Sequence, residues 1–161
     1  MKRLVLGVAI TISVFFPASP ASAAKPTIER FPADQSFVDH SCGFAVRVHV
    51  TGIVIQITRT DASGNVRTFQ SYPRDRQTLT NVKTGTTITT SLSGPQHFTQ
   101  NADGSSALAG TGPWAWSPNP VTGDPGIFLT EGRFILASDS QGNGSFSTVG
   151  RVVALCPKLA G

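Results

Sequence analysis

Apolar and polar residues alternate with a period of two over much of the chain. Between residues 44 and 58 one phase of the alternation is apolar at 44, 46, 48 and 50 and, after Gly52, at 53, 55 and 57. The other phase holds Ala45, Arg47, His49, Thr51, Val54, Gln56 and Thr58. This alternation is typical of strands that bury one face, and the glycine between the two runs predicts a hairpin with its tight turn at Thr51-Gly52. In that hairpin one face enters the core, and the opposite face carries Arg47, His49, Gln56 and Thr58.

Short stretches rich in β-branched residues continue to the C-terminus, separated by turns that contain Gly, Asn or Asp. They predict strands over residues 66–72, 78–82, 87–92, 95–100, 106–111, 127–130, 133–137, 144–148 and 151–156. Glu131-Gly132 is interpreted as the turn between two of these strands. The spacing and the short connections predict a single all-β domain over residues 42–161. We expect an antiparallel β-barrel-like fold, with a β-sandwich as the alternative.

Two segments depart from this pattern. Residues 24–41 are expected to form an extended N-terminal arm. Residues 113–125 contain four prolines and predict a long irregular connection, of the kind that is often functional. Residues 81–85 and 119–123 share the turn-like pattern Asn-x-x-Thr-Gly.

The first 23 residues have the pattern of a secretory signal peptide. Lys2 and Arg3 precede an apolar run over residues 4–16, and Ala21-Ser22-Ala23 is a small-residue cleavage site. The run is shorter than the roughly 20 residues that a transmembrane helix needs. The sequence therefore predicts that residues 1–23 are removed and that the mature protein is secreted, without a membrane anchor.

The charge balance argues against nucleic-acid binding. The chain has 13 basic and 9 acidic residues, a net charge of +4, and loss of Lys2 and Arg3 with the signal peptide lowers this to +2. Nucleic-acid-binding domains cluster their basic residues on one face. The densest basic group here, Arg74-Asp75-Arg76, is divided by an acid.

The sequence contains two cysteines, Cys42 and Cys156. In an exported chain a lone pair predicts a disulfide. It would tie the first predicted strand to the last, and a barrel places those two strands side by side. The chain-entropy model gives such a bridge up to roughly 5 kcal/mol. Zinc would need four ligands, and the three histidines do not fall at metal-site spacing with the cysteines. We expect no metal and no cofactor.

Several short stretches resemble a known family. They are Ser41-Cys42-Gly43-Phe44, residues 78–85 with 93–95, residues 125–133 and the tail 150–156. Together they resemble an uncharacterised family of small secreted proteins of high-GC Gram-positive bacteria (actinobacteria), which has no established activity. The resemblance covers most of the mature chain. It implies export and a disulfide, and it transfers no functional residue.

Trp114 and Trp116 are the first candidate binding residues. They lie two apart, so in an extended segment both rings face the same way. They predict either a stacking platform for a sugar ring or another flat apolar ligand, or a plug that closes one end of the barrel.

Arg47 and His49 form a second candidate group with their polar neighbours. They would line the interior of a barrel if the apolar face of these strands pointed outward against a second layer of the protein. Otherwise they lie on a sheet face that is exposed to solvent. Catalytic patterns are scarce, because glycosidases usually need two carboxylates across a cleft and Glu131 is the only glutamate beyond the N-terminal arm.

The leading functional hypothesis is a secreted, non-enzymatic protein that binds a small molecule or a component of the cell envelope. One alternative is a small barrel enzyme with His49 or Glu131 as an acid-base group in its lumen. A second alternative is a structural or protein-interaction module at the cell surface. The sequence does not predict the oligomeric state.

Overall fold

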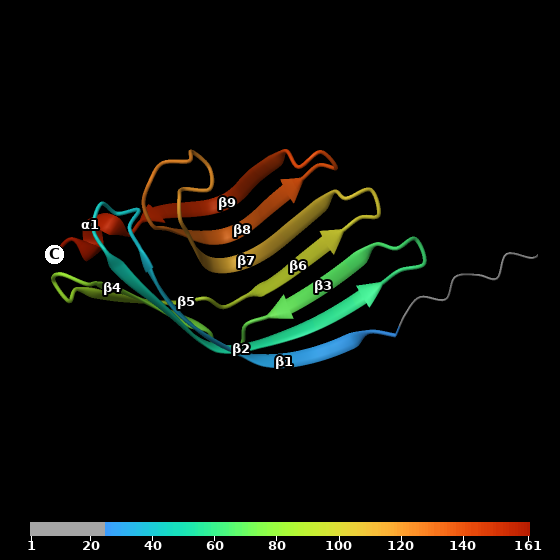
Figure 1. Cartoon of the computed structure of the whole chain (residues 1–161), viewed down its shortest axis with the longest axis horizontal. Helices are drawn as coiled ribbons and strands as arrows, with labels where there is room; N and C mark the ends of the chain where they lie inside the picture. The colour runs from blue at the N-terminus through green and yellow to red at the C-terminus, as the bar shows by residue number, and fades with distance from the viewer. Residues whose placement is uncertain (1–24) are drawn as a thin grey trace, which may run out of the picture.

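The computed structural model describes residues 25–161, which form an almost entirely antiparallel β structure (Figure 1). The prediction of an all-β domain is confirmed. The predicted signal peptide, residues 1–23, lies outside the described residues. The strands are β1 (Thr27–Asp39), β2 (Val46–Thr60), β3 (Val66–Ser71), β4 (Arg76–Asn81), β5 (Thr87–Ser91), β6 (Pro95–Gln100), β7 (Ser106–Trp116), β8 (Phe128–Ser138) and β9 (Gly144–Ala154), and the short helix α1 (Cys156–Leu159) follows them.

The long strand β2 organises the sheet. The whole length of β1 pairs with β2, from Thr27 opposite Thr58 to Asp39 opposite Val46. On the other edge of β2, β4 pairs with residues 46–51 and β3 pairs with residues 55–60. The sheet branches from there, because β5 extends it beyond β4 while β6, β7, β8 and β9 follow β3 in order.

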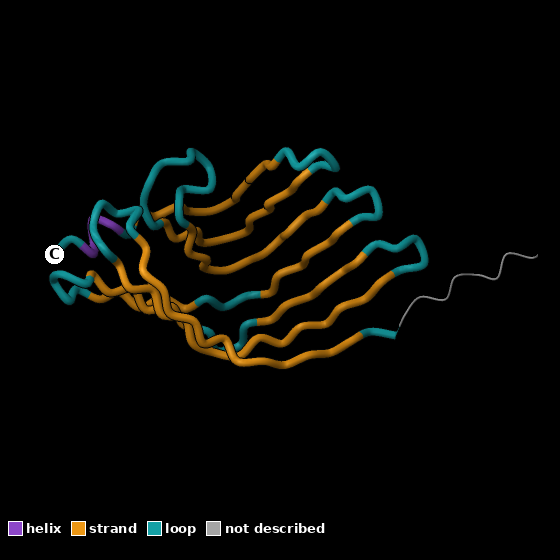
Figure 2. The backbone as a smooth tube through the Cα atoms, in the orientation of Figure 1, coloured by secondary structure: helices purple, strands orange, loops and turns teal. Residues whose placement is uncertain are grey.

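The sheet is curled around a core but is not closed. Figure 2 shows the strands fanning out at one end of the molecule and converging at the end that holds the C-terminus. There, Val48 and Leu79 of β2 and β4 pack in one buried cluster with Leu129 of β8 and Leu155 and Leu159 near the C-terminus. Among the described strands, β1, β5 and β9 each pair with one neighbour only, and they do not pair with one another. The architecture thus shares features of the predicted barrel and of its sandwich alternative.

Cys42 and Cys156 form the predicted disulfide, with Cα atoms 5.3 Å apart. Cys42 lies in the loop that leads into β2, and Cys156 begins α1. Both half-cystines pack against the buried cluster. The bridge therefore joins the two facing sides of the curled sheet, and not two adjacent strands as expected for a barrel.

Glycines bend the long strands at points where the sequence predicts turns. β2 runs through Gly52 (φ 153°) and β8 runs through Gly132 (φ 127°), so both predicted hairpin turns are wrong. Gly112, Gly132 and Gly150 are paired directly across β7, β8 and β9. A Cβ at any of these three would overlap a backbone oxygen of a neighbouring segment. Glycine therefore allows the three strands to bend together along this line.

The unbroken path of β2 decides which side chains share a face. Residues 46 and 48 point into the curled sheet and join its core, and because side chains alternate along a strand, residues 54, 56 and 58 point the same way. We call this side the inner face and the other the outer face. Arg47 and His49 lie on the outer face with Ile55 and Ile57. The prediction that they share a face with Gln56 and Thr58 is wrong, because the chain does not reverse at Gly52.

Two further segments differ from expectation. The arm predicted over residues 24–41 is extended, but its residues 27–39 are β1 and belong to the sheet. The irregular connection predicted from Pro113 begins later, since β7 continues through that proline to Trp116. No helix among residues 25–161 has the length and apolar character needed to cross a membrane.

Candidate functional site: a groove on the inner face

A groove runs along the inner face between β1 and β2 on one side and the C-terminal end of β7 on the other. Two hollows of about 280 Å³ and 230 Å³ form it. The smaller hollow is lined by Val48 and Trp116, and the larger one by Val50 and Trp114. The two hollows adjoin, because Val50 follows Val48 on the same face of β2, and Trp114 precedes Trp116 on the same face of β7. We call the two hollows together the inner groove. Its main lining side chains are Phe31, Phe37, Asp39, Val48, Val50, Val54, Tyr72, Asp75, Gln77, Trp114, Trp116 and Ile127.

Trp114 and Trp116 form one wall of the inner groove, and their rings face the same side as predicted. Trp114 meets Tyr72 edge-on with ring centroids 4.9 Å apart, and Trp116 meets Phe134 edge-on at 5.1 Å. Trp116 Nε1 also donates a hydrogen bond to Thr130 Oγ1 at 2.9 Å. These contacts hold the indoles in place, so the wall is ordered before any ligand arrives.

Phe31 and Phe37 of β1 form the opposite wall. They are 41% and 52% exposed, although large aromatic side chains are usually mostly buried. Both border the hollows rather than the core cluster. Aromatic side chains that remain exposed around a hollow are typical of a surface that receives a ligand.

A row of polar side chains crosses the inner face beside the groove. Gln70 Nε2 donates to Gln56 Oε1 at 2.7 Å, and Gln56 Nε2 donates to Glu29 Oε2 at 3.3 Å. The Tyr72 hydroxyl donates to Gln70 Oε1 at 2.8 Å and lies 3.1 Å from Gln96 Oε1. The row fixes the position of Tyr72, and Tyr72 in turn supports Trp114.

Asp75 is a buried carboxyl group in the larger hollow, with 1% of its surface exposed. Its Oδ1 accepts a hydrogen bond from the backbone N–H of Ile53 at 2.7 Å. Burial raises the pKa of Asp75 above its ordinary value of 3.8, and the hydrogen bond from Ile53 only partly offsets this. Burial, and then the charge of Asp75, also raise the pKa of Tyr72 above 10.0.

Gln77 adds a second unusual polar group, in the smaller hollow. Its side chain is 8% exposed, and its Oε1 accepts no hydrogen bond from the part of the chain that the structure describes. Thr90, which is paired with it across β4 and β5, likewise has a buried hydroxyl without a partner in residues 25–161. Leaving a buried acceptor unpaired costs about 1–3 kcal/mol, so such a group calls for an explanation.

Asp39 lies in the same hollow as Gln77. Its Oδ1 accepts a hydrogen bond from the backbone N–H of Ser41 at 2.7 Å. Burial acts to raise the pKa of Asp39, but the hydrogen bonds from Ser41 and Ser117 outweigh it and hold that pKa below 3.8. Asp39 is therefore ionised at neutral pH.

Arg47 and His49 are not part of the inner groove. On the outer face, His49 Nε2 lies 3.3 Å from Asp34 Oδ1, and the His49 side chain is 48% exposed. Glu131 pairs with Arg151 through an N–O contact of 2.6 Å and also lies outside the groove. The structure thus brings the two tryptophans together and separates them from the other candidate residues.

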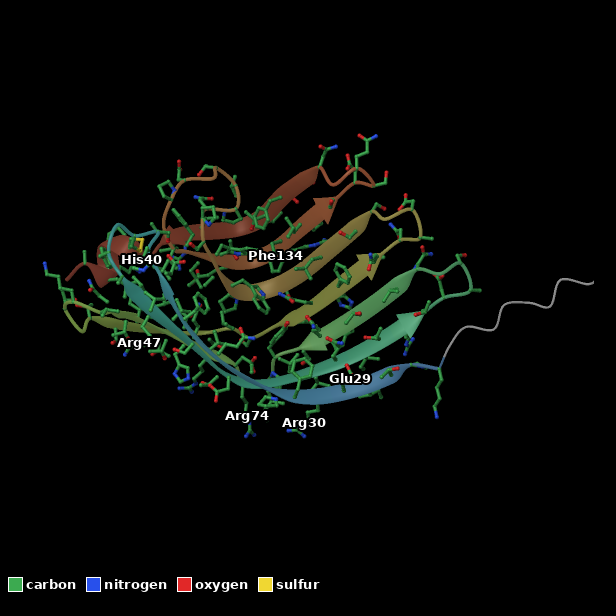
Figure 3. All side chains as sticks on the ribbon, viewed as in Figure 1. Glu29, Arg30, His40, Arg47, Arg74 and Phe134 are labelled. Carbon is green, nitrogen blue, oxygen red and sulfur yellow. A yellow bond between two sulfur atoms is a disulfide. The ribbon has the colours of Figure 1, made fainter. Side chains whose placement is uncertain are left out.

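The strand register gathers most arginines on the outer face. Figure 3 shows Arg30, Arg47 and Arg74 on the outside of the curl and Phe134 within it. The sequence alone does not reveal this grouping, because the pairing of strands far apart in the chain creates it. The absence of nucleic-acid binding stays a prediction. By their strand register, the outer-face arginines are Arg30, Arg47, Arg59, Arg67, Arg76 and Arg133.

Sequence reasoning missed Asp75 and Gln77. Both lie between the predicted strands 66–72 and 78–82, and Asp75 was considered only as the acid that divides two arginines. The available signal was the alternation itself, because positions 75, 77, 79 and 81 are all buried and share the inner face. Leu79 marks that face as buried, so the polar residues in phase with it are buried as well.

Residues 25–161 contain no group of three or more His, Cys, Asp or Glu side chains arranged to hold a metal ion. Comparison with known protein families, with curated proteins and with solved structures finds no significant match. The resemblance to secreted actinobacterial proteins therefore stays a prediction. The geometry of the inner groove carries the functional argument.

Proposed function

We propose that the protein is a secreted binding protein that takes up a small, largely apolar molecule in the inner groove. Export is supported by the signal-peptide pattern of residues 1–23 and by the disulfide, since disulfides persist in oxidising compartments outside the cytoplasm. The ligand is a molecule of the surroundings or a component of the cell envelope. The high-GC Gram-positive origin belongs to the same proposal.

One observation carries this proposal. Two aromatic walls face each other across hollows of ligand size, and one of them, Phe31 with Phe37, is left exposed. Small-molecule sites are concave and mainly apolar, with a few polar groups that orient the ligand. Asp39, Asp75 and Gln77 supply such polar groups here.

Tryptophan fluorescence tests the proposal directly, because both tryptophans of the chain line the inner groove. Titration with the neutral apolar probe phenylnaphthylamine should enhance the probe's fluorescence and quench the tryptophans with one saturable site. Phe37→Ala should weaken binding about tenfold, from the lost burial of one aromatic ring. Val38→Ala is the matched control, because Val38 is 49% exposed on the outer face of the same strand.

Saturable binding that both variants share equally would place the probe elsewhere and contradict the proposal. Native mass spectrometry of protein secreted by its own host provides a second test. A mass above that of the chain, lost on denaturation, is the expected result and would identify the ligand.

A further inference from the structure

We propose that the ligand of the inner groove is an organic cation, a protonated amine attached to an apolar body. This inference rests on the proposed function and specifies the chemical class of the ligand. It follows from the polar groups of the groove, which are acceptors and carboxylates set among aromatic rings.

The first argument is charge. Asp39 and Asp75 both line the inner groove, and no Lys, Arg or His of the described residues, 25–161, does. The protein nevertheless has more basic than acidic residues, and six of the seven arginines in its described strands lie on the outer face. A cleft whose charge is opposite to that of the remaining surface concentrates ligands of positive charge.

The second argument is the unpaired acceptor. Gln77 Oε1 is buried in the same hollow as Asp39 and lacks a donor anywhere in residues 25–161. A ligand ammonium carries N–H donors that can satisfy this oxygen while its charge pairs with the carboxylate. A carboxylate ligand has no donor to offer and would meet like charge.

The third argument is the desolvation of Asp75. This side chain is 1% exposed and receives a hydrogen bond from Ile53, yet no cationic side chain among residues 25–161 lines its hollow. Burying a carboxylate without an opposite charge is costly. A bound cation in this hollow would remove that cost.

The aromatic walls suit the same ligand. Trp114 and Tyr72 lie in the hollow of Asp75, and Trp116 and Phe37 lie in the hollow of Gln77. The faces of such rings attract ammonium groups, Trp most strongly. The rings also bury the apolar body, so one ligand satisfies both the charged and the apolar parts of the groove.

Three probes that share one hydrocarbon chain and differ in their head group test the inference. Octylamine is protonated at neutral pH, octanol is neutral and octanoate is an anion. Binding to the full mature protein is measured by tryptophan fluorescence and calorimetry at neutral pH and low salt. We expect octylamine to bind at least tenfold more tightly than octanoate, with octanol between them.

Variants assign the preference to named groups. Asp39→Asn and Gln77→Leu should each weaken octylamine binding at least threefold, and by a larger factor than they weaken octanol binding. Asp34→Asn is the control, because it removes an equal charge from the outer face of the same strand, where the Asp34 side chain is 77% exposed. It should change neither affinity. Circular dichroism and the melting temperature of each variant establish that it is folded.

The outcomes separate the two proposals. Octanoate binding as tightly as octylamine, or Asp34→Asn weakening octylamine as much as Asp39→Asn, would overturn the cation inference and leave a binding protein for apolar molecules. If none of the three probes binds, and phenylnaphthylamine does not bind either, both proposals are wrong.

Discussion

The side chain of Asp75 lies against the backbone of Gly52. Asp75 Oδ1 accepts the hydrogen bond of the next backbone N–H, that of Ile53, at 2.7 Å, and a Cβ on residue 52 would overlap the carboxylate. This contact lies where β4 and β3, which pair with successive parts of β2, diverge. It holds a bend of the longest strand and brings a buried carboxyl group into the inner groove.

Gly52→Ala should destabilise the fold by about 2–4 kcal/mol, since it combines a strained positive φ with an overlap that no rotamer relieves. Urea unfolding measures the loss. Gly144→Ala is the matched control, because its Cβ would approach no atom more closely than 3.9 Å, and it should change stability by less than about 1 kcal/mol. Equal effects of the two substitutions would refute the role of the Asp75 contact.

Asp75→Asn should stabilise the protein at neutral pH. Because burial raises the folded pKa of Asp75 above 3.8, the folded state holds its proton more tightly than the unfolded state. The contribution of Asp75 to stability therefore falls as pH rises from about 3.8 to the folded pKa, and it stays low above that. Asparagine removes this loss and keeps an oxygen for the Ile53 N–H. Unfolding free energies of both proteins between acid and neutral pH should agree at low pH and diverge as pH rises.

Asp139→Asn provides a control of opposite sign for that pH series. Hydrogen bonds from Asn143, by its side chain and backbone, lower the pKa of Asp139 below 3.8. Its contribution to stability is present above the unfolded pKa and is lost as pH falls through the folded pKa. The variant should therefore match the wild-type protein at low pH and be the less stable of the two at neutral pH. If Asp139→Asn were instead more stable than the wild-type protein at neutral pH, as expected for Asp75→Asn, the lowered pKa of Asp139 would be contradicted.

Asn81→Ala should destabilise the protein by about 2–3 kcal/mol. Asn81 is 3% exposed, and its Nδ2 donates to the carbonyl of Leu159 at 3.0 Å, which fastens α1 to β4. Its Oδ1 accepts hydrogen bonds from the backbone N–H groups of Lys83 and Thr84. Thermal unfolding provides the measurement.

Asn119 is the matched control for Asn81. Its Oδ1 accepts the equivalent backbone hydrogen bonds, from Val121 and Thr122, but no bond from its Nδ2 to another segment is present in the described part of the chain. Asn119→Ala should therefore cost less than half as much as Asn81→Ala. An equal cost would mean that the turn, and not the contact with Leu159, makes Asn81 important.

Loss of the disulfide should cost about 2–5 kcal/mol. The bridge joins residues 114 apart in sequence and holds α1 against the core cluster. Cys42→Ala, Cys156→Ala and the double variant should lose the same amount, because each removes the whole cross-link. Unfolding in urea, with and without a reductant, measures it. A reductant should lower the stability of the wild-type protein alone, and an unchanged midpoint would contradict the prediction.

Much of the β framework could be predicted because its signals are local. The alternation from residue 44 to 50, the Gly-, Asn- and Asp-containing turns and the single pair of cysteines each depend on neighbouring residues or on simple counting. The same local rules failed at Gly52 and Gly132. A glycine between two strand-like runs has the same sequence in a turn and in a bent continuous strand, and only the neighbouring strands distinguish the two.

The candidate site divides in the same way. The shared direction of Trp114 and Trp116 follows from their spacing of two in an extended segment. That these rings face Phe31 and Phe37 depends on the curl of the sheet, which brings β7 opposite β1. Arg47 and His49 were predicted to share a face with Gln56 and Thr58. They do not, because β2 continues through Gly52 in its pairing with β1, so the alternation of faces runs on without a reversal.

The sequence by itself therefore determined the all-β class, most strand positions and the cysteine pair, since period-two alternation, turn residues and the cysteine count are local properties. Tertiary structure alone decided that Asp75 and Gln77 are buried and that Asp39 and Asp75 line the groove while most strand arginines face outward. Burial and charge segregation depend on register and curvature, which arise only when strands far apart in the chain pair and pack together.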